Sequence, residues 1–234
     1  YCEMGAFGQC ISYDYLGSRR DGAWAEYVCA PVANLLRLPP EVDLVDAALT
    51  EPAAVALHAL RQGDLTPGDV VAILGAGAIG MLVAQWARIW GAGRILLVDI
   101  DERRVEMARR LWLGETWNAR HGDPAEWAQV QTVDHGVDLV VEASGASVAF
   151  EQALRMARPL GRVVILGNPS GNVTLPQETI SQLLRKQLTV RGTWNSHFAA
   201  LPVDEWGVTL EMIAGRRLDV RSLISHRPSL EEAP

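Results

Sequence analysis

The stretch VVAILGAGAIGMLVAQW, residues 70–86, decides the fold. Its first five residues form a continuous apolar run, which is typical of a parallel β-strand covered on both faces. Gly75, Gly77 and Gly80 follow, and apolar residues then recur at three- and four-residue spacing: Ile79, Leu82, Val83, Trp86 and Trp90. This pattern predicts a strand, a tight glycine turn and an amphipathic helix that Gly91 ends in a left-handed conformation.

Further apolar runs alternate with helical stretches as far as residue 170. Together with 70–74, the predicted strands are 95–98, 139–141 and 163–166. The alternation predicts an α/β fold with a doubly wound Rossmann sheet. Residues 1–45 instead mix glycines, aromatics and short β-like runs such as 25–30, and the alternation fades after 188–192. We therefore divide the chain into residues 1–50, 51–190 and 191–234.

The composition excludes several classes of protein. A formal net charge of −7 argues against a nucleic-acid partner. No apolar run approaches the ~20 residues that cross a bilayer, so we expect no membrane partner. Three cysteines are too few for a disulfide scaffold and favour a reducing cytoplasm.

The glycine turn has the sequence context of a dinucleotide-binding loop. Gly75 would make the turn, Gly77 would let the backbone approach a pyrophosphate, and Gly80 would let the helix pack closely on the strand. Free N–H groups at the helix start, including those of Ala78 and Ile79, would face the phosphates. The alternative is a plain strand–helix turn.

Asp99 lies nineteen residues after Gly80, at the end of the next predicted strand. Its carboxylate can accept hydrogen bonds from both ribose hydroxyls and would repel a 2′-phosphate, which favours NAD over NADP. A solvated strand end is the alternative. Arg103 and Arg104 would either hold a 2′-phosphate or lie on the exposed face of the following helix.

Two later strand ends fit the same cofactor site. VDLVVEASGA (137–146) ends a strand near Ser144, and RVVILGNPSG (162–171) ends another at Gly167. Ligands of open α/β sheets bind at the carboxyl edge, so we expect both residues to contact the cofactor. Plain turns would explain them equally simply.

Five stretches resemble the zinc-dependent medium-chain dehydrogenase/reductase (alcohol dehydrogenase) family. They are YDYLGSRRDGAWAEYV (13–28), LTEPAAVALHAL (49–60), ILGAGAIG (73–80), LLRKQLTVRGTWNS (183–196) and RLDVRSLISHR (217–227). The chain is most similar to the galactitol-phosphate, sorbitol and threonine dehydrogenase branches. The resemblance implies a partial β-rich GroES-like catalytic domain in 1–50, with part of a structural zinc lobe. It also implies an NAD-binding Rossmann domain in 51–190 and a return to the catalytic domain in 191–234.

The resemblance also implies two zinc sites. Cys2 and Cys10 have the C-x7-C spacing of the last two ligands in the family's four-cysteine structural site, although two unrelated free cysteines are the alternative. Glu51 would be a ligand of the catalytic zinc or would hold its bound water. Alternatively, Glu51 is simply an acid beside Pro52 at a helix start.

Two other residues have simpler interpretations. Cys29 falls within the β-like run 25–30, where we expect a small buried hydrophobic residue. His58 lies seven residues after Glu51, and we expect a histidine packed within a helix.

The resemblance places the segment after residue 192 near nicotinamide and substrate. Trp194 would exclude water, and Asn195 and Ser196 would hydrogen-bond polyol hydroxyls, although a packed loop is an equal alternative. Arg19 and Arg20 are possible anion contacts for a sugar phosphate. A solvated loop, or a salt bridge to Asp21 or Glu26, would explain these arginines equally well.

The resemblance implies an oxidoreductase that transfers hydride between NAD and the secondary alcohol of a polyol or polyol phosphate, with Zn²⁺ as the second cofactor. Alternatives are a threonine or other secondary-alcohol dehydrogenase, a zinc-free reductase and a non-catalytic NAD-binding module. We expect a homodimer or homotetramer. The chain begins with Tyr1 and not Met, and we interpret it as a fragment that is inactive without further zinc ligands.

Overall fold

The computed structural model describes residues 1–197 and 204–232. The chain divides into two compact units. We call Val55–Trp194 the sheet unit, and Tyr1–Ala54 together with Asn195–Pro234 the irregular unit. Helix α2 (Thr50–Gln62) begins in the irregular unit and continues into the sheet unit.

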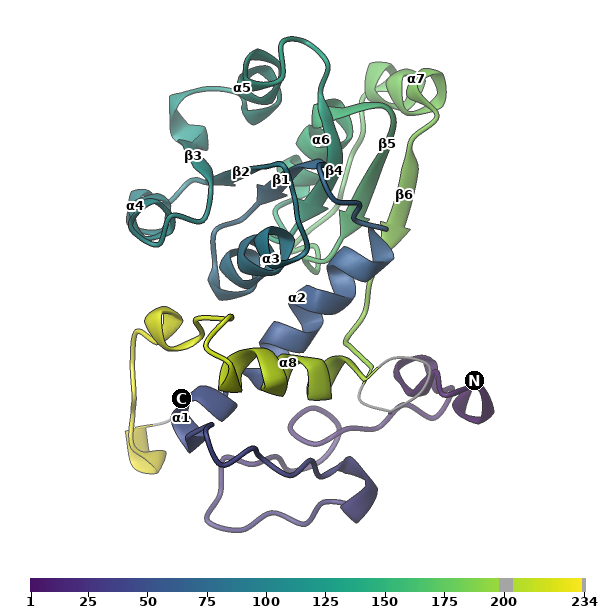
Figure 1. Ribbon diagram of the computed structural model, residues 1–234. Coiled ribbons are helices and arrows are strands. Elements are labelled where there is room, and N and C mark those ends of the chain that lie inside the picture. Colours follow the sequence, from purple (N-terminus) through teal and green to yellow (C-terminus); the bar gives the residue numbers. More distant parts are fainter. Residues whose placement is uncertain (198–203, 233–234) are drawn as a thin grey trace. The chain divides into compact units, whose positions relative to one another are not determined.

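The sheet unit is built on one parallel six-stranded sheet in the order β3-β2-β1-β4-β5-β6 (Figure 1). Its strands are β1 (Val70–Leu74), β2 (Arg94–Asp99), β3 (Glu115–Asn118), β4 (Val137–Glu142), β5 (Ala157–Ile165) and β6 (Thr189–Gly192). The helices are α3 (Ala78–Ile89), α4 (Glu102–Arg110), η4 (Ala119–His121), α5 (Pro124–Gln131), α6 (Ser147–Met156) and α7 (Gln177–Lys186). Helices α3 and α4 lie on one face of the sheet, and α5, α6 and α7 on the other.

This architecture confirms the predicted doubly wound Rossmann sheet. All four predicted strands are present as β1, β2, β4 and β5, the run 188–192 contains β6, and the predicted amphipathic helix is α3. Gly91 follows α3 with φ of 91°, as expected for a left-handed residue after a helix. Strand β3 was missed because its sequence, ETWN, lacks the apolar run of its neighbours.

The core of the sheet unit lies between the central strands and the helices. Ala72 on β1 is the register partner of Val140 on β4, and both are fully buried. They belong to an apolar cluster that includes Ala128 of α5 and Ala153 of α6. Small residues on these helices allow close approach to the sheet.

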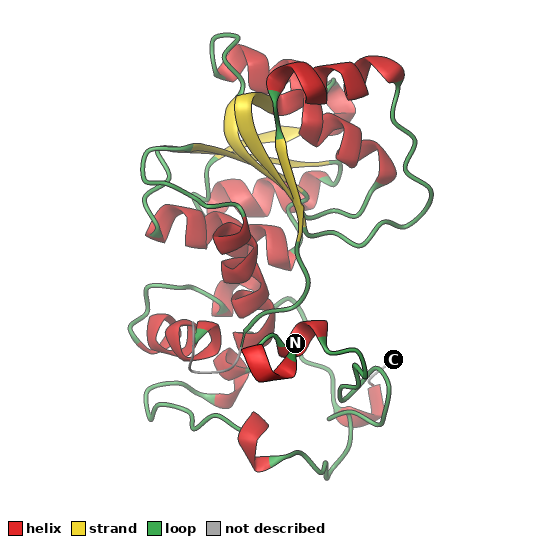
Figure 2. Cartoon of the chain, turned by 90° about the vertical axis from the view of Figure 1, so that its right-hand side faces the viewer, coloured by secondary structure: helices red, strands yellow, loops and turns green. Residues whose placement is uncertain are grey.

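The irregular unit contains two α-helices and five short 3₁₀ turns among its described residues. These are α1 (Leu44–Ala47), α8 (Glu205–Ala214), η1 (Cys2–Met4), η2 (Phe7–Gln9), η3 (Val32–Asn34), η5 (Arg221–Leu223) and η6 (Leu230–Glu232). Figure 2 shows loops and short helices in its described residues. Its described backbone forms one isolated β-bridge, between Leu16 and Arg20.

The β-like run predicted at 25–30 is wrong. These residues are irregular, and Cys29 is exposed instead of buried within a strand. A strand needs a hydrogen-bonded neighbour, and the described residues supply none for this run. Among the helices that the structure describes, none combines the length and apolar content needed to span a bilayer.

Candidate cofactor-binding site

The glycine turn after β1 contains one glycine whose presence packing does not explain. Gly75 has φ of 104°, and a Cβ there would lie 2.9 Å from the Ser144 nitrogen. A Cβ at Gly80 would lie 1.8 Å from the Gly75 carbonyl oxygen. Gly77, however, has φ of −70°, and the structure places nothing within 4 Å of its Cβ position. The fold therefore requires Gly75 and Gly80, but it leaves the space over Gly77 free for a ligand.

Helix α3 begins at this open space. Gly77 is its N-cap and has no side chain to accept a hydrogen bond from the first turn. The N–H groups at Ala78 and Ile79 therefore lack a capping side chain at this end of the helix. Together with the positive end of the helix dipole, they suit an anionic group such as a phosphate.

Asp99 holds the glycine turn from the β2 side. This last residue of β2 is buried, and its Oδ2 accepts a hydrogen bond from the Ala76 N–H at 2.7 Å. Its Oδ1 accepts from the Asp101 N–H at 2.8 Å. Asp99 is thus a buried, hydrogen-bonded residue, and the solvated strand end considered from the sequence is wrong.

The two arginines after Asp99 differ in position. Arg104 Nη1 lies 3.5 Å from Asp99 Oδ2, and the Arg104 side chain is 56% exposed. Arg103 is exposed, and its N–H donates to the Asp101 side chain that caps α4. An acidic and a basic side chain therefore stand together at the end of β2.

The turns after β1, β4 and β5 meet at the carboxyl edge of the sheet. The Ala143 N–H donates to the Leu74 carbonyl oxygen at 2.8 Å. A Cβ at Gly167 would lie 2.2 Å from the Gly145 nitrogen, so these two turns are also in contact. The structure brings Ser144 and Gly167, both predicted from the sequence, to the edge that carries the glycine turn.

Glu142 is a residue of this edge that sequence reasoning missed. It ends β4 and is buried beside the turn that contains Ser144. The signal was available, because Glu142 ends an apolar strand in the same way as Asp99. From the stretch VDLVVEASGA (137–146), only the turn residue Ser144 was assigned to the cofactor site on the sequence alone.

The segment 194–196 is held by the protein itself. Trp194 is 50% exposed at the end of the sheet unit. In the irregular unit, the Asn195 amide donates to the Tyr13 hydroxyl, and Trp206 Nε1 donates to Ser196 Oγ at 3.0 Å. These bonds favour the packed-loop alternative for Asn195 and Ser196.

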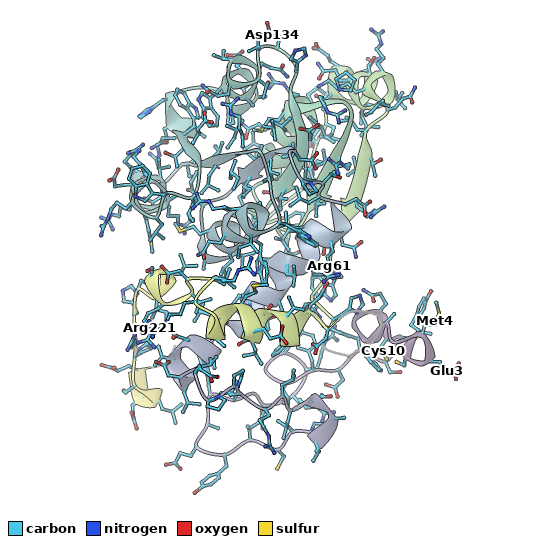
Figure 3. The ribbon with its side chains drawn as sticks, viewed as in Figure 1. Glu3, Met4, Cys10, Arg61, Asp134 and Arg221 are labelled. Carbon is cyan, nitrogen blue, oxygen red and sulfur yellow. The ribbon has the colours of Figure 1, made fainter. Side chains whose placement is uncertain are left out.

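The two predicted structural-zinc cysteines lie together. A hydrogen bond with the Cys10 side chain raises the pKa of the Cys2 thiol, and both are free thiols. Figure 3 labels Cys10 together with Glu3 and Met4, which belong to the same first turns of the chain. Two thiols fit half of a four-thiolate zinc site. The described residues contain no cluster of three or more potential metal ligands.

Glu51 is the second residue of α2, at its first turn. Partial removal of the carboxyl from water raises the pKa of Glu51, although the side chain as a whole is exposed. In this position the Glu51 carboxylate could serve as one ligand of a metal ion. It would equally well interact favourably with the positive end of the helix dipole.

The remaining predicted residues have defined surroundings. His58 is buried in α2, and its Nε2 lies 3.4 Å from the Gln62 side-chain nitrogen, which confirms a packed helix histidine. Arg20 Nε donates to the Asp14 carboxylate at 3.1 Å, so Arg20 forms a salt bridge, but with Asp14 instead of the alternatives Asp21 and Glu26. Asp14 lies two residues before Leu16, the bridge partner of Arg20, which explains why the two side chains are close together.

Comparison with known proteins identifies the family. Residues 78–214, more than half of the chain, match the family model described as zinc-binding dehydrogenase. This chain belongs to the zinc-binding dehydrogenase family. The resemblance to zinc-dependent medium-chain dehydrogenases seen in the sequence is therefore confirmed.

Individual members of the zinc-binding dehydrogenase family match nearly the whole chain. Galactitol 1-phosphate 5-dehydrogenase from Escherichia coli (strain K12) is 32% identical over 230 residues, which are 98% of this chain and 66% of that protein. L-threonine 3-dehydrogenase from Bacillus velezensis is 31% identical over 232 residues, 99% of this chain and 65% of that protein. This chain thus spans just under two thirds of the length of these relatives.

A solved structure of the zinc-binding dehydrogenase family has the same fold. A crystal structure from Sinorhizobium meliloti 1021, described as a zinc-binding dehydrogenase bound to NADP, has a TM-score of 0.89 at 31% identity. The match covers 100% of this chain and 67% of that one. The family model is thus described by zinc binding, and one solved relative with this fold binds a nicotinamide cofactor.

Proposed function

We propose that the sheet unit binds NAD at the glycine turn and that the complete protein uses it to oxidise the secondary alcohol of a polyol or polyol phosphate. The open space over Gly77 carries this proposal. At Gly75 and Gly80 a Cβ atom would collide with neighbouring atoms, whereas at Gly77 it would meet none. A diphosphate needs such open space to come close to the backbone.

Each residue of the edge has a distinct role in this proposal. The amides of Ala78 and Ile79 bind the diphosphate, and Asp99 accepts hydrogen bonds from the adenosine ribose. Ser144 and Gly167 line the same edge beside the ribose. NAD, when bound, supplies the hydride acceptor. The protein supplies a fixed surface, partly shielded from water, that orients the bound NAD.

The preference for NAD over NADP rests on the charge at the end of β2. Asp99 is buried and close to the turn, so a 2′-phosphate there would meet a carboxylate with little water between them. Arg104 opposes this preference, but it is more exposed and is already drawn to Asp99. The NADP-bound relative makes cofactor preference the first property to measure.

We propose that Cys2 and Cys10 provide two thiolates of a structural zinc site. For Glu51 we propose a place beside a catalytic zinc. Zinc, when bound, would polarise the alcohol and favour its ionised form. The raised pKa of Glu51 is consistent with a carboxyl partly removed from water. We also propose that Trp194, the last residue of the sheet unit, shields the cofactor site from water.

The substrate class follows from the relatives in this proposal. Galactitol 1-phosphate is the substrate in one relative's name, and L-threonine, named in another, is the alternative. We place the complete enzyme in the cytoplasm as a homodimer or homotetramer. A non-catalytic NAD-binding module would bind cofactor and oxidise neither substrate. Assays of the zinc-loaded full-length enzyme with galactitol 1-phosphate, sorbitol and L-threonine separate these possibilities.

The experiment that tests cofactor binding is Gly77→Ala. The methyl group meets no protein atom, so we expect an unchanged melting temperature. NAD affinity should fall at least ~10-fold, because a methyl forced into a close contact costs roughly 1–3 kcal/mol. Gly171→Ala is the matched control, since a Cβ there is 3.8 Å from its nearest neighbour.

Titration of NADH fluorescence gives both affinities, and NADPH is titrated in parallel. Unchanged NADH affinity in Gly77→Ala would contradict the proposed site. Tighter binding of NADPH than NADH would leave the site in place and reverse the assignment of Asp99.

A further inference from the structure

Glu142 is a buried acid at the end of β4, the strand beside β1. It is 2% exposed, and burial raises the pKa of its carboxyl. In the described part of the chain no arginine or lysine forms an ion pair with it; its contacts are with N–H and O–H donors. An acid in such surroundings costs free energy unless it is fully hydrogen-bonded, so its contacts define what it does.

These contacts organise the turn after β4. Glu142 Oε1 accepts from the Ser144 N–H at 2.8 Å, from the Ser144 hydroxyl and from the Gly145 N–H at 3.0 Å. Ser144 Oγ in turn accepts from the Ala146 N–H at 3.1 Å. One carboxylate oxygen thereby holds Ser144 and Gly145 directly, and it holds Ala146 through the Ser144 hydroxyl.

The same residue ties this turn to the turn after β5. The main-chain oxygen of Glu142 accepts from the Leu166 N–H at 2.9 Å and the Gly167 N–H at 2.8 Å. A Cβ at Gly167 would approach Glu142 Oε2 to 2.7 Å. The backbone at Gly167 thus lies directly against the carboxylate.

The turn fixed by Glu142 is the surface on which the glycine turn rests. A Cβ at Gly75 would lie 2.9 Å from the Ser144 nitrogen and 3.0 Å from its Cα. On the opposite side, Asp99 holds the glycine turn through Ala76. The two strands that flank β1 therefore each end in a buried acid, and the two acids hold the glycine turn from both sides.

We propose that Glu142 is a positioning residue for the cofactor. It does not touch the dinucleotide; it holds the turn 143–146 against Gly75, so that the amides at the start of α3 are fixed before the cofactor arrives. A site fixed in advance binds more tightly because less order is lost on binding. The inference rests on the proposed binding of NAD to this edge.

Two substitutions test the inference. Glu142→Gln keeps the shape and an acceptor oxygen but removes the charge that strengthens the hydrogen bonds. We expect NADH affinity to fall about 3- to 10-fold, since charge-assisted bonds are roughly twice as strong as neutral ones. Glu142→Asp keeps the charge and shortens the side chain, so the carboxylate no longer reaches Gly145, and the loss should be larger.

Asp138→Asn is the matched control, because Asp138 lies in the same strand at the opposite edge of the sheet. It pairs with Arg158 and accepts from the Val70 N–H, both away from the glycine turn. This variant should lower the melting temperature and leave NADH affinity within about twofold, as expected of a residue far from the site.

The outcomes separate this inference from the proposed function. Wild-type protein that binds neither NADH nor NADPH contradicts both. Wild-type binding with unchanged affinity in Glu142→Gln and in folded Glu142→Asp overturns the role of Glu142 alone. Should Glu142→Asp not fold, Glu142→Gln decides: weaker binding at a nearly unchanged melting temperature supports the inference, and wild-type affinity overturns it.

Discussion

The sheet unit and the irregular unit differ in where their apolar residues lie. In the sheet unit, the central strands β1 and β4 are almost wholly buried. In the irregular unit, Val42 is the one buried residue among the described positions 1–49. Trp24 and Tyr27, at 69% and 91% exposed, are typical of that segment. The comparison shows that one chain contains both a densely packed core and a region with little core of its own.

Other interactions hold the described parts of the irregular unit together. Arg221, labelled in Figure 3, donates from its Nε to Asp46 at 2.7 Å. Its guanidinium also pairs with Asp43, the N-cap of α1. The Asp46 N–H and Arg221 hold the pKa of Asp43 below its usual range. These charges are exposed, so salt weakens them readily. The sheet unit therefore depends on burial. In the irregular unit, exposed ion pairs supplement a small set of buried apolar residues that includes Leu210, Ile213 and Leu218.

The largest expected effect is in the core of the sheet. Leu139→Ala removes a fully buried side chain from β4 and should destabilise the sheet unit by about 2–5 kcal/mol. Leu35→Ala removes a side chain that is 62% exposed, and we expect a change within about 0.5 kcal/mol. Urea unfolding followed by far-UV circular dichroism measures both. Similar losses for the two variants would contradict the comparison.

The next effect concerns glycines that lie against other backbone atoms. In Gly80→Ala the new Cβ would lie 1.8 Å from the Gly75 oxygen, and the packed turn cannot move away. We expect roughly 1–3 kcal/mol of destabilisation together with loss of NADH binding. In the irregular unit, Gly22→Ala would bring a Cβ to 2.7 Å from the Gly17 Cα, in a loop with few buried neighbours.

We expect the loop around Gly22 to shift, so that the melting temperature changes little. Thermal unfolding of both variants tests this difference. A melting temperature in Gly22→Ala as low as in Gly80→Ala would show that the irregular unit is packed more rigidly than its burial indicates.

A third difference appears in the pH dependence of stability. Burial alone would raise the pKa of Asp138, but hydrogen bonds from the Val70 N–H and from Arg158 outweigh it and lower the pKa. The lowered pKa means that the Asp138 carboxylate stabilises the fold above about pH 4, its ordinary range. This stabilisation is lost as the pH falls through the lowered value.

Asp138→Asn should therefore be less stable than wild type at pH 7, and the gap should close under acid conditions. Asp43→Asn, which removes an exposed acid with a lowered pKa, should show a smaller gap that shrinks further in high salt. Unfolding experiments from pH 7 down to about pH 3 measure both. A gap for Asp138→Asn that does not change with pH would contradict this assignment.

The sequence predicted the sheet unit well and the irregular unit poorly, for one physical reason. Strands such as 70–74 and helices such as α3 have a regular geometry, so burial on one or both faces produces a pattern that can be read along the chain. The run 25–30 has β-like residues, but whether it forms a strand depends on a partner that no local pattern encodes. Cys29 was assigned to the core by the same reasoning and is exposed.

The same limit applies to the cofactor site, where single contacts could not be predicted from local sequence patterns. The glycine turn and Asp99 could be predicted because a strand, a turn and an acid occur at a characteristic spacing. The contacts of Asp99 with Ala76 and of Glu142 with Ser144 could not, since they depend on which strands flank β1 and on the register between them. Strand order comes from the packed fold and not from any single stretch of sequence.

The smallest expected effect tests local order in the irregular unit. The hydrogen bond with Cys10 raises the pKa of Cys2, whereas Cys29 is exposed in an irregular segment. A higher pKa leaves less of the reactive thiolate at neutral pH, so iodoacetamide should label Cys2 more slowly than Cys29.

Cys10→Ser should shift the labelling rate of Cys2, because a hydroxyl replaces the thiol that contacts it, while the rate at Cys29 stays constant. Mass spectrometry of the labelled peptides at pH 7 gives the rates at Cys2 and Cys29 in both proteins. If Cys10→Ser leaves the rate at Cys2 unaltered, the two turns that carry these cysteines are not held together in solution. The irregular unit would then lack order even at this short range, and its difference from the sheet unit would be larger than the burial of its residues indicates.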